Sequence, residues 1–245
     1  MGKTARFFMG VAVASVAFCA TASADIIVQQ LPGQGGGPAS DTLFRNQLNQ
    51  IVWEQDADNI ILSTPAMVRQ ISWWGFYGGS GTPATPPPAT ETMRIRFYGA
   101  RTSDNLPDDN NILLEESFLD APRTATGLFI AVGGRPNEYR YQVELTAPIL
   151  LEAGTLYWLE VVQVGDVDSL FRWESGETGI VLPGLSFKHT FLPNWQAETG
   201  SLAFELSTVP EPNTFGFMTF GLLLKPRRRV RRGARARSGV PFEGA

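Results

Sequence analysis

Cysteine and histidine are almost missing from this chain of 245 residues: the only cysteine is Cys19 and the only histidine is His189. These counts exclude an internal disulfide, a multi-cysteine metal site and a multi-histidine zinc site. A Ser-His-Asp triad would have to use His189, whose neighbours lack the glycines of a nucleophile elbow. We therefore expect no catalytic residue and interpret His189 as a surface or strand-end imidazole.

Basic residues are scarce in the middle of the chain. Residues 25–208 contain 22 of the 24 acidic residues but only 10 of the 20 basic ones, a net charge of -12. Binding of nucleic acid needs clustered lysine and arginine, so the composition excludes nucleic acid as a partner. Sequence repeats of 20 to 50 residues are also missing, which argues against a solenoid or a propeller.

Residues 1–24 have the order of a secretory signal peptide. Lys3 and Arg6 precede the apolar stretch Phe7–Ala20, and the small residues Ala22 and Ala24 form a cleavage site before Asp25. The apolar stretch of 14 residues is shorter than the roughly 20 residues that span a bilayer. The pattern predicts export by the Sec machinery and a mature chain that starts at Asp25.

The C-terminal region, residues 209–245, has three parts in a fixed order. A Pro-Glu-Pro triplet is followed by the apolar stretch Thr214–Leu224, for which we expect a short helix, and then by an arginine-rich tail. This order resembles the PEP-CTERM sorting signal, and the residues that carry the resemblance are Pro210, Glu211, Pro212, Arg227, Arg228 and Arg229. The resemblance implies transient insertion in the inner membrane, with the arginines on the cytoplasmic side, and cleavage by an exosortase-type protease.

Residues 25–208 show alternating or short apolar runs separated by turn residues, a pattern that is typical of strands. We expect an all-β fold, a single antiparallel β-sandwich. The predicted strands are 26–30, 50–53, 67–77, 92–100, 112–119, 138–145, 155–164, 169–174, 185–192 and 202–207.

Alternation predicts which side chains face the core. In one strand Met93, Ile95 and Phe97 should face inward, while Arg94 and Arg96 should face water. In another, Tyr139, Tyr141, Val143 and Leu145 share a face.

Three aromatic segments resemble the ectodomains that often precede PEP-CTERM signals. They are Ile71–Tyr77 (ISWWGFY), Ile95–Tyr98 (IRFY) and Gly154–Val161 (GTLYWLEV). The resemblance implies a jelly-roll-like sandwich whose function is undefined.

Six tryptophans offer candidate ligand-binding surfaces, because exposed aromatic rings stack on sugars. Trp73 and Trp74 are adjacent in a predicted strand, so their indoles should point to opposite faces. Since Ile71 is a natural core residue on the face of Trp73, we expect Trp73 to be buried and Trp74 to point outward. Trp74 and Trp173 are the candidate ligand-binding residues, with core packing as the alternative for each.

Carboxylates raise two further possibilities. Glu54, Asp56 and Asp58 resemble the E-x-D-x-x-E strand of jelly-roll glucanases, but the third acid comes one residue early, so we expect no glycosidase. Two loops concentrate the oxygen ligands that calcium prefers, and the alternative is that they are solvated turns. The candidate calcium ligands are Asp104, Asp108, Asp109, Asp166 and Asp168.

These observations predict an exported, non-enzymatic β-sandwich protein of the cell surface or the extracellular matrix. Its expected role is adhesion or the organisation of exopolysaccharide in a biofilm, and polysaccharide is the expected ligand class. Calcium is the one cofactor that the composition leaves open. The alternatives are a jelly-roll carbohydrate-active enzyme and a structural protein that an unprocessed transmembrane segment tethers to the membrane.

Overall fold

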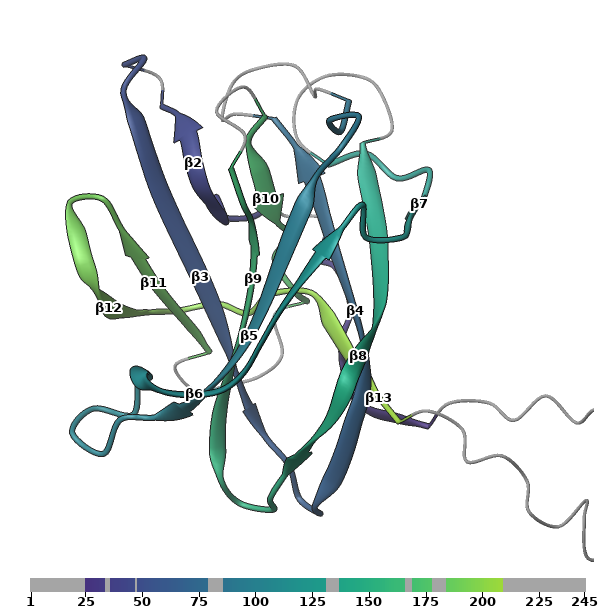
Figure 1. Ribbon diagram of the computed structural model, residues 1–245, viewed down its shortest axis with the longest axis vertical. Helices are drawn as coiled ribbons and strands as arrows, with labels where there is room; N and C mark the ends of the chain where they lie inside the picture. The colour runs from purple at the N-terminus through teal and green to yellow at the C-terminus, as the bar shows by residue number, and fades with distance from the viewer. Residues whose placement is uncertain are drawn as a thin grey trace, which may run out of the picture. The chain divides into compact units, whose positions relative to one another are not determined.

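The strands of the protein form two sheets, which a computed structural model describes for residues 25–33, 36–46, 48–78, 86–130, 137–165, 169–177 and 184–208. The first sheet has the order β1 (Ile26–Gln30), β13 (Phe204–Ser207), β4 (Ala66–Tyr77), β8 (Glu138–Leu151) and β7 (Arg123–Ala125), and β10 (Phe171–Trp173) also pairs with β4. The second has the order β12 (Leu192–Glu198), β11 (Leu185–His189), β3 (Ile51–Ile61), β2 (Asp41–Arg45), β9 (Leu156–Gln163), β5 (Thr92–Ala100) and β6 (Pro107–Leu119). Figure 1 shows the arrangement of these strands.

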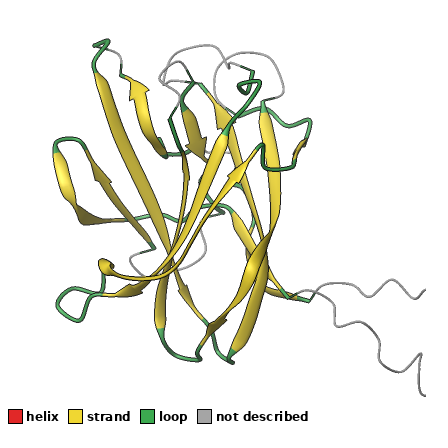
Figure 2. Cartoon of the chain, viewed as in Figure 1, coloured by secondary structure: helices red, strands yellow, loops and turns green. Residues whose placement is uncertain are grey.

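The prediction of an all-β fold is confirmed. The part of the chain that the structure describes contains strands and connecting loops and no helix (Figure 2). It therefore contains no helix that is long and apolar enough to cross a bilayer. The prediction of purely antiparallel pairing is wrong at one place, because β2 runs parallel to β9 where Asp41 pairs with Gln163.

Eight strands carry most of the pairing and follow a regular order. In one sheet the order is β1-β13-β4-β8, and in the other it is β3-β9-β5-β6. Consecutive strands mostly alternate between the two sheets along the chain, so neighbours within a sheet come from distant parts of the sequence. Of the remaining strands, β7, β11 and β12 extend these sheets at their edges, β2 pairs with both β3 and β9, and β10 pairs with β4.

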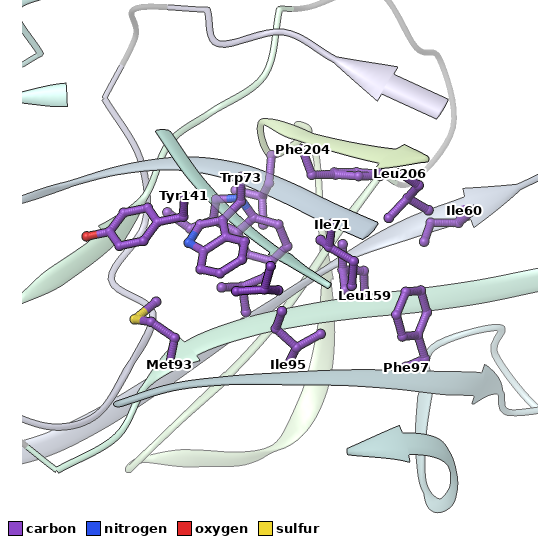
Figure 3. Packing of buried hydrophobic residues seen from close by; sticks show 14 of the residues in the cluster. Ile60, Ile71, Trp73, Met93, Ile95, Phe97, Tyr141, Leu159, Phe204 and Leu206 are labelled. Carbon is purple, nitrogen blue, oxygen red and sulfur yellow. The ribbon is translucent and has the colours of Figure 1, made fainter. Parts of the chain in front are cut away.

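The main hydrophobic core takes side chains from both sheets (Figure 3). Trp73 of β4 stacks on Tyr141 of β8, with ring centroids 5.1 Å apart and an interplanar angle of 4°. The second sheet contributes Met93, Ile95 and Phe97 of β5, all fully buried. The predicted inward faces of the strands at 92–100 and 138–145 are thereby confirmed.

The two arginines of β5 lie, as predicted, on the face of the strand that points away from the main core. The expectation that they face water is wrong. The side chains of Arg94 and Arg96 are only 15% and 18% exposed. Both flank the fully buried Glu160, and Arg94 Nη2 lies 3.0 Å from the carboxylate. Tyr98 also donates a hydrogen bond to Glu160. This face of the second sheet is therefore covered by an ion-pair network and not by solvent.

Most predicted strands overlap strands of the structure, and several run further than predicted, as β8 does from 145 to Leu151. The strands at 26–30 and 92–100 have the predicted bounds. The strand predicted at 50–53 extends to Ile61 through the acidic residues Glu54, Asp56 and Asp58. The strands β2, β7 and β12 were not predicted, since their apolar residues are few.

Trp73 and Trp74 point to opposite faces of β4, as predicted. However, Trp74 is only 7% exposed, so the expectation that it presents an open surface is wrong. Arg140 of β8 covers its ring at 5.4 Å from the centroid. Gly75, the next residue, leaves no room for a side chain, because an added Cβ would lie 2.5 Å from the Phe171 ring of β10.

Because both indoles are buried, alanine at either position should destabilise the fold. We expect Trp73→Ala to lower the free energy of unfolding by about 3–5 kcal/mol, as is typical for a large aromatic removed from a core. Trp74→Ala should cost less, since its ring packs outside the main core. Chemical denaturation of both variants measures this order, and a Trp74→Ala variant as stable as the wild type would contradict the burial.

Candidate functional site

A row of acidic side chains runs along one face of β3. Glu54, Asp56 and Asp58 alternate along the strand and share the face of Ile60, which belongs to the main core. Asp56 and Asp58 are fully buried, and Glu54 is partly exposed. The inward face of β3 therefore changes from apolar to acidic as the strand runs back toward residue 54.

A row of aromatic rings lies beside this acidic row. Phe187 and His189 of β11 pair with Asp56 and Glu54 in the antiparallel register, so these side chains share one face. The imidazole stacks on the Phe187 ring with centroids 5.8 Å apart, and it meets the Phe191 ring edge to face at 6.0 Å. Since His189 is the last residue of β11, the expectation of a strand-end imidazole is confirmed.

The turn after β11 is attached to β3 by the backbone of Trp53. The Trp53 N–H donates to the Thr190 hydroxyl at 2.8 Å, and the Thr190 N–H donates to the Trp53 carbonyl at 3.1 Å. The Phe191 N–H donates to Nδ1 of His189 at 3.2 Å. These bonds hold the turn, with its His189 and Phe191 rings, beside one shallow groove that Trp53 also lines. Because Trp53 is next to Glu54 in β3, its own ring points to the opposite face of the strand.

We call this depression the aromatic groove. Its volume is about 260 Å³, which is close to the lower end of the range for small-molecule sites. It is lined by Phe44, Asn46, Val52, Trp53, Glu54, His189, Thr190 and Phe191. The lining therefore combines aromatic rings, an amide, a hydroxyl and one carboxylate.

Trp53 is the tryptophan that the sequence analysis did not single out. Trp73, Trp74, Trp158, Trp173 and Trp195 are all buried. Trp53 is partly exposed and is the one of the six tryptophans that lines this groove. Phe191 is 67% exposed, which is unusual for a phenylalanine that is held by its neighbours.

Burial makes the acidic row behind the groove hard to ionise. Desolvation raises the pKa of Glu54, and the charge of Glu198 raises it further, while Arg172 lowers it. Desolvation also raises the pKa of Asp56 well above its usual range, with further contributions from Glu54 and Glu198. Among the described residues neither carboxylate oxygen of Asp56 has a hydrogen-bond partner.

Asp58 differs from Asp56 because it has a partner. The Leu202 N–H donates to Oδ2 of Asp58 and lowers its pKa, but desolvation is the larger effect and raises the pKa well above its usual range. Asp58 therefore links β3 to the segment before β13, and Asp56 remains the unpartnered acid of the row.

The predicted ligand-binding residues Trp74 and Trp173 do not reach this groove. Trp173 is fully buried in the main core, and its indole N–H donates to the Ala203 carbonyl at 2.9 Å. The expected exposure of Trp74 is wrong because Arg140 covers it. Both residues therefore follow the alternative of core and cross-strand packing.

A second, polar depression of about 560 Å³ lies over β7 and β8, near Trp74. It is lined by Gln70, Pro122, Arg123, Thr124, Thr126, Arg140, Gln142, Val143 and Glu144. Its two arginines are already paired, Arg123 with Glu91 and Arg140 with Glu205. No aromatic ring lies among its described lining residues, so it offers no stacking surface.

The candidate calcium ligands that the structure describes are engaged in local contacts. Asp104 pairs with Arg101 at 2.9 Å, and Asp108 accepts the Asn110 N–H at 3.0 Å. Asp109 pairs with Lys188 at 2.7 Å and accepts the Trp195 indole N–H at 3.1 Å. Within the described ranges no three acidic, histidine or cysteine side chains come together as a metal site.

Other predicted residues lie outside the described residues. They are the candidate calcium ligands Asp166 and Asp168, the signal-peptide residues Ala22 and Ala24, and the sorting-signal residues Pro210, Glu211, Pro212, Arg227, Arg228 and Arg229.

Comparison with known proteins gives no relative from which a function can be transferred. No protein-family model matches the chain, and no curated protein matches it. The functional argument therefore depends on the aromatic groove and on the sequence signals.

The buried charge of Asp56 predicts a pH-dependent stability. Because the pKa of Asp56 is raised in the folded state, the folded protein binds more protons than the unfolded chain between the ordinary aspartate range, about pH 4, and the raised value. The free energy of unfolding should therefore fall as the pH rises through this window. Asp56→Asn should remove part of that loss and raise the melting temperature at pH 8, by about 2–4 °C for each kcal/mol recovered.

Thermal unfolding from pH 4 to pH 8 measures this effect, with Glu152→Gln as the control for an exposed carboxylate. An Asp56→Asn variant that is less stable than the wild type at pH 8 would mean that the carboxylate is ionised and satisfied.

Proposed function

We propose that this protein is an exported, non-enzymatic β-sandwich protein that binds polysaccharide at the cell surface or in the extracellular matrix. Its role is adhesion or the organisation of exopolysaccharide. The order of the eight main strands supports a jelly-roll-like sandwich, since the two sheets share one core and consecutive strands alternate between them.

The observation that carries the proposal is the exposed aromatic wall of the groove. Sugars present flat apolar faces and hydroxyl groups at their edges, so a binding site for them combines aromatic rings with amide, hydroxyl and carboxylate groups. His189 and Phe191 supply the rings, while Asn46, Glu54 and Thr190 supply polar groups. The attachment of Thr190 to Trp53 holds this wall in place without a bound ligand.

The carbohydrate-active enzyme is the weaker alternative. Glycosidases need two carboxyl groups that reach the scissile bond, about 5–9.5 Å apart. Glu54 is the one carboxylate among the described lining residues of the groove, while Asp56 is fully buried behind it. This arrangement favours binding over hydrolysis.

For the route to the surface we propose export by the Sec machinery and processing of the PEP-CTERM-like signal by an exosortase-type protease. The support is the order of the sequence signals, from the apolar N-terminal stretch to Pro210–Pro212 and the arginine-rich tail. The alternative is a structural protein that keeps its C-terminal segment and stays tethered to the membrane.

The binding proposal predicts a specific loss on removal of the groove's rings. His189→Ala and Phe191→Ala should each weaken retention on the exopolysaccharide of the source cell by up to about tenfold, since a stacked ring contributes about 0.5–1.5 kcal/mol. The matched control is Phe129→Ala, which removes a ring that is 53% exposed away from the groove. Affinity electrophoresis measures retention, and thermal unfolding checks the fold. Equal retention of all three variants and the wild type would contradict the site.

The processing proposal predicts the mass of the mature protein. Intact-mass measurement on protein from the cell surface should give a chain that starts at Asp25 and lacks the residues after about Pro210. A mass that still includes Arg227, Arg228 and Arg229 would instead support the tethered alternative.

A further inference from the structure

The surroundings of the aromatic groove contain more negative than positive charge. Five titratable or charged groups face Glu54 from the elements packed against it: Asp56 on β3, Asp41 on β2, His189 on β11, Glu198 on β12 and Arg172 on β10. Four of these six groups, counting Glu54 itself, are carboxyl groups, and Arg172 is the only permanent cation among them. The site therefore lacks positive charge.

Arg172 does not supply the missing charge at close range. Its Nε donates to the Gly78 carbonyl at 2.8 Å, and its Nη1 donates to the Gly37 carbonyl at 2.9 Å. None of the ion pairs among the described residues joins Arg172 to a carboxylate. The guanidinium thus holds backbone segments together and acts on the acids only from a distance.

The unpartnered carboxylate of Asp56 is a second indication that positive charge is missing at this site. It lies two residues from Glu54 on the same face of β3, a separation of about 6–7 Å along the strand. It is fully buried and has no hydrogen-bond donor among the described residues. A cation bound at Glu54 would stabilise the ionised form of Asp56, because the two groups are close together and little water screens them.

The aromatic rings favour a cation of a particular kind. A cation over an aromatic face gains about 0.5–2 kcal/mol from the ring quadrupole. The same chain already forms such contacts elsewhere, with Arg140 over Trp74 at 5.4 Å and Lys188 over Trp195 at 4.4 Å. In the groove, His189 and Phe191 offer rings on the face of Glu54, and no lysine or arginine is among the described lining residues.

We propose that the aromatic groove binds protonated amino sugars, so that the polysaccharide it recognises carries free amino groups. The ammonium group of the sugar donates to Glu54, and the ring of Phe191 contacts the apolar face of the same sugar. Residues 25–208, with their net charge of -12, attract such a polycation over longer distances. This inference rests on the proposed function and specifies its ligand.

The test compares two oligosaccharides that differ only in the charge of their amino groups. Titration calorimetry on the full chain at pH 6 uses the pentamer of glucosamine and the pentamer of N-acetylglucosamine. We expect the wild type to bind the amine form at least tenfold more tightly, a difference of about 1.4 kcal/mol.

Variants of Glu54 assign this preference to the groove. Glu54→Gln should remove it, and Glu54→Asp, which keeps the charge, should retain most of it. Glu152→Gln, a neutralised carboxylate exposed elsewhere, should leave it unchanged. Thermal unfolding of each variant confirms that the fold is intact.

The outcomes separate this inference from the proposed function. If the wild type binds both pentamers equally and Phe191→Ala weakens both, the groove binds neutral sugars and the amine inference is overturned. A preference that survives in Glu54→Gln also overturns it, because the amine then binds elsewhere. If the wild type binds neither pentamer, the amine inference is overturned. Retention on the native exopolysaccharide then tests the proposed function separately.

Discussion

The structure depends on a conflict along β3, where one face of a single strand must be apolar at Ile60 and acidic at Glu54. Because side chains alternate strictly in a strand, Asp56 and Asp58 cannot turn away from the interior without moving Ile60 as well. One carboxylate oxygen of Asp58 accepts a hydrogen bond from the backbone before β13, whereas neither oxygen of Asp56 has a partner among the described residues. β3 therefore buries a carboxyl group at a cost in stability, two residues from Glu54 of the groove.

The β11–β12 hairpin connects this acidic row to the surface. Its register places Phe187 and His189 beside Asp56 and Glu54, and the turn places Phe191 at the rim. A ligand in the groove would thus meet aromatic rings first and a partly buried carboxylate behind them. This order of environments is the basis of the preference that we propose, for a sugar that also carries positive charge.

Much of the fold could be predicted because alternation is strong where one face is apolar, as in Met93, Ile95 and Phe97. The same rule failed for Arg94 and Trp74, since a single strand does not reveal what covers its second face. The groove was missed for a related reason. Trp53 is the last residue of the predicted strand, because the acids after it do not continue the apolar alternation, although His189 and Phe191 in alternation with Phe187 are a usable signal.

The central claim is that the ligand binds in the aromatic groove. The most direct measurement is an NMR titration of the imidazole C–H signals of His189, the only histidine of the chain, and of the indole N–H signals with oligosaccharides from the native exopolysaccharide. The account predicts that the His189 signals shift on addition of the sugar while the indole signals of Trp74 and Trp173 stay in place. A shift of the Trp74 or Trp173 signal with unchanged His189 signals would contradict it.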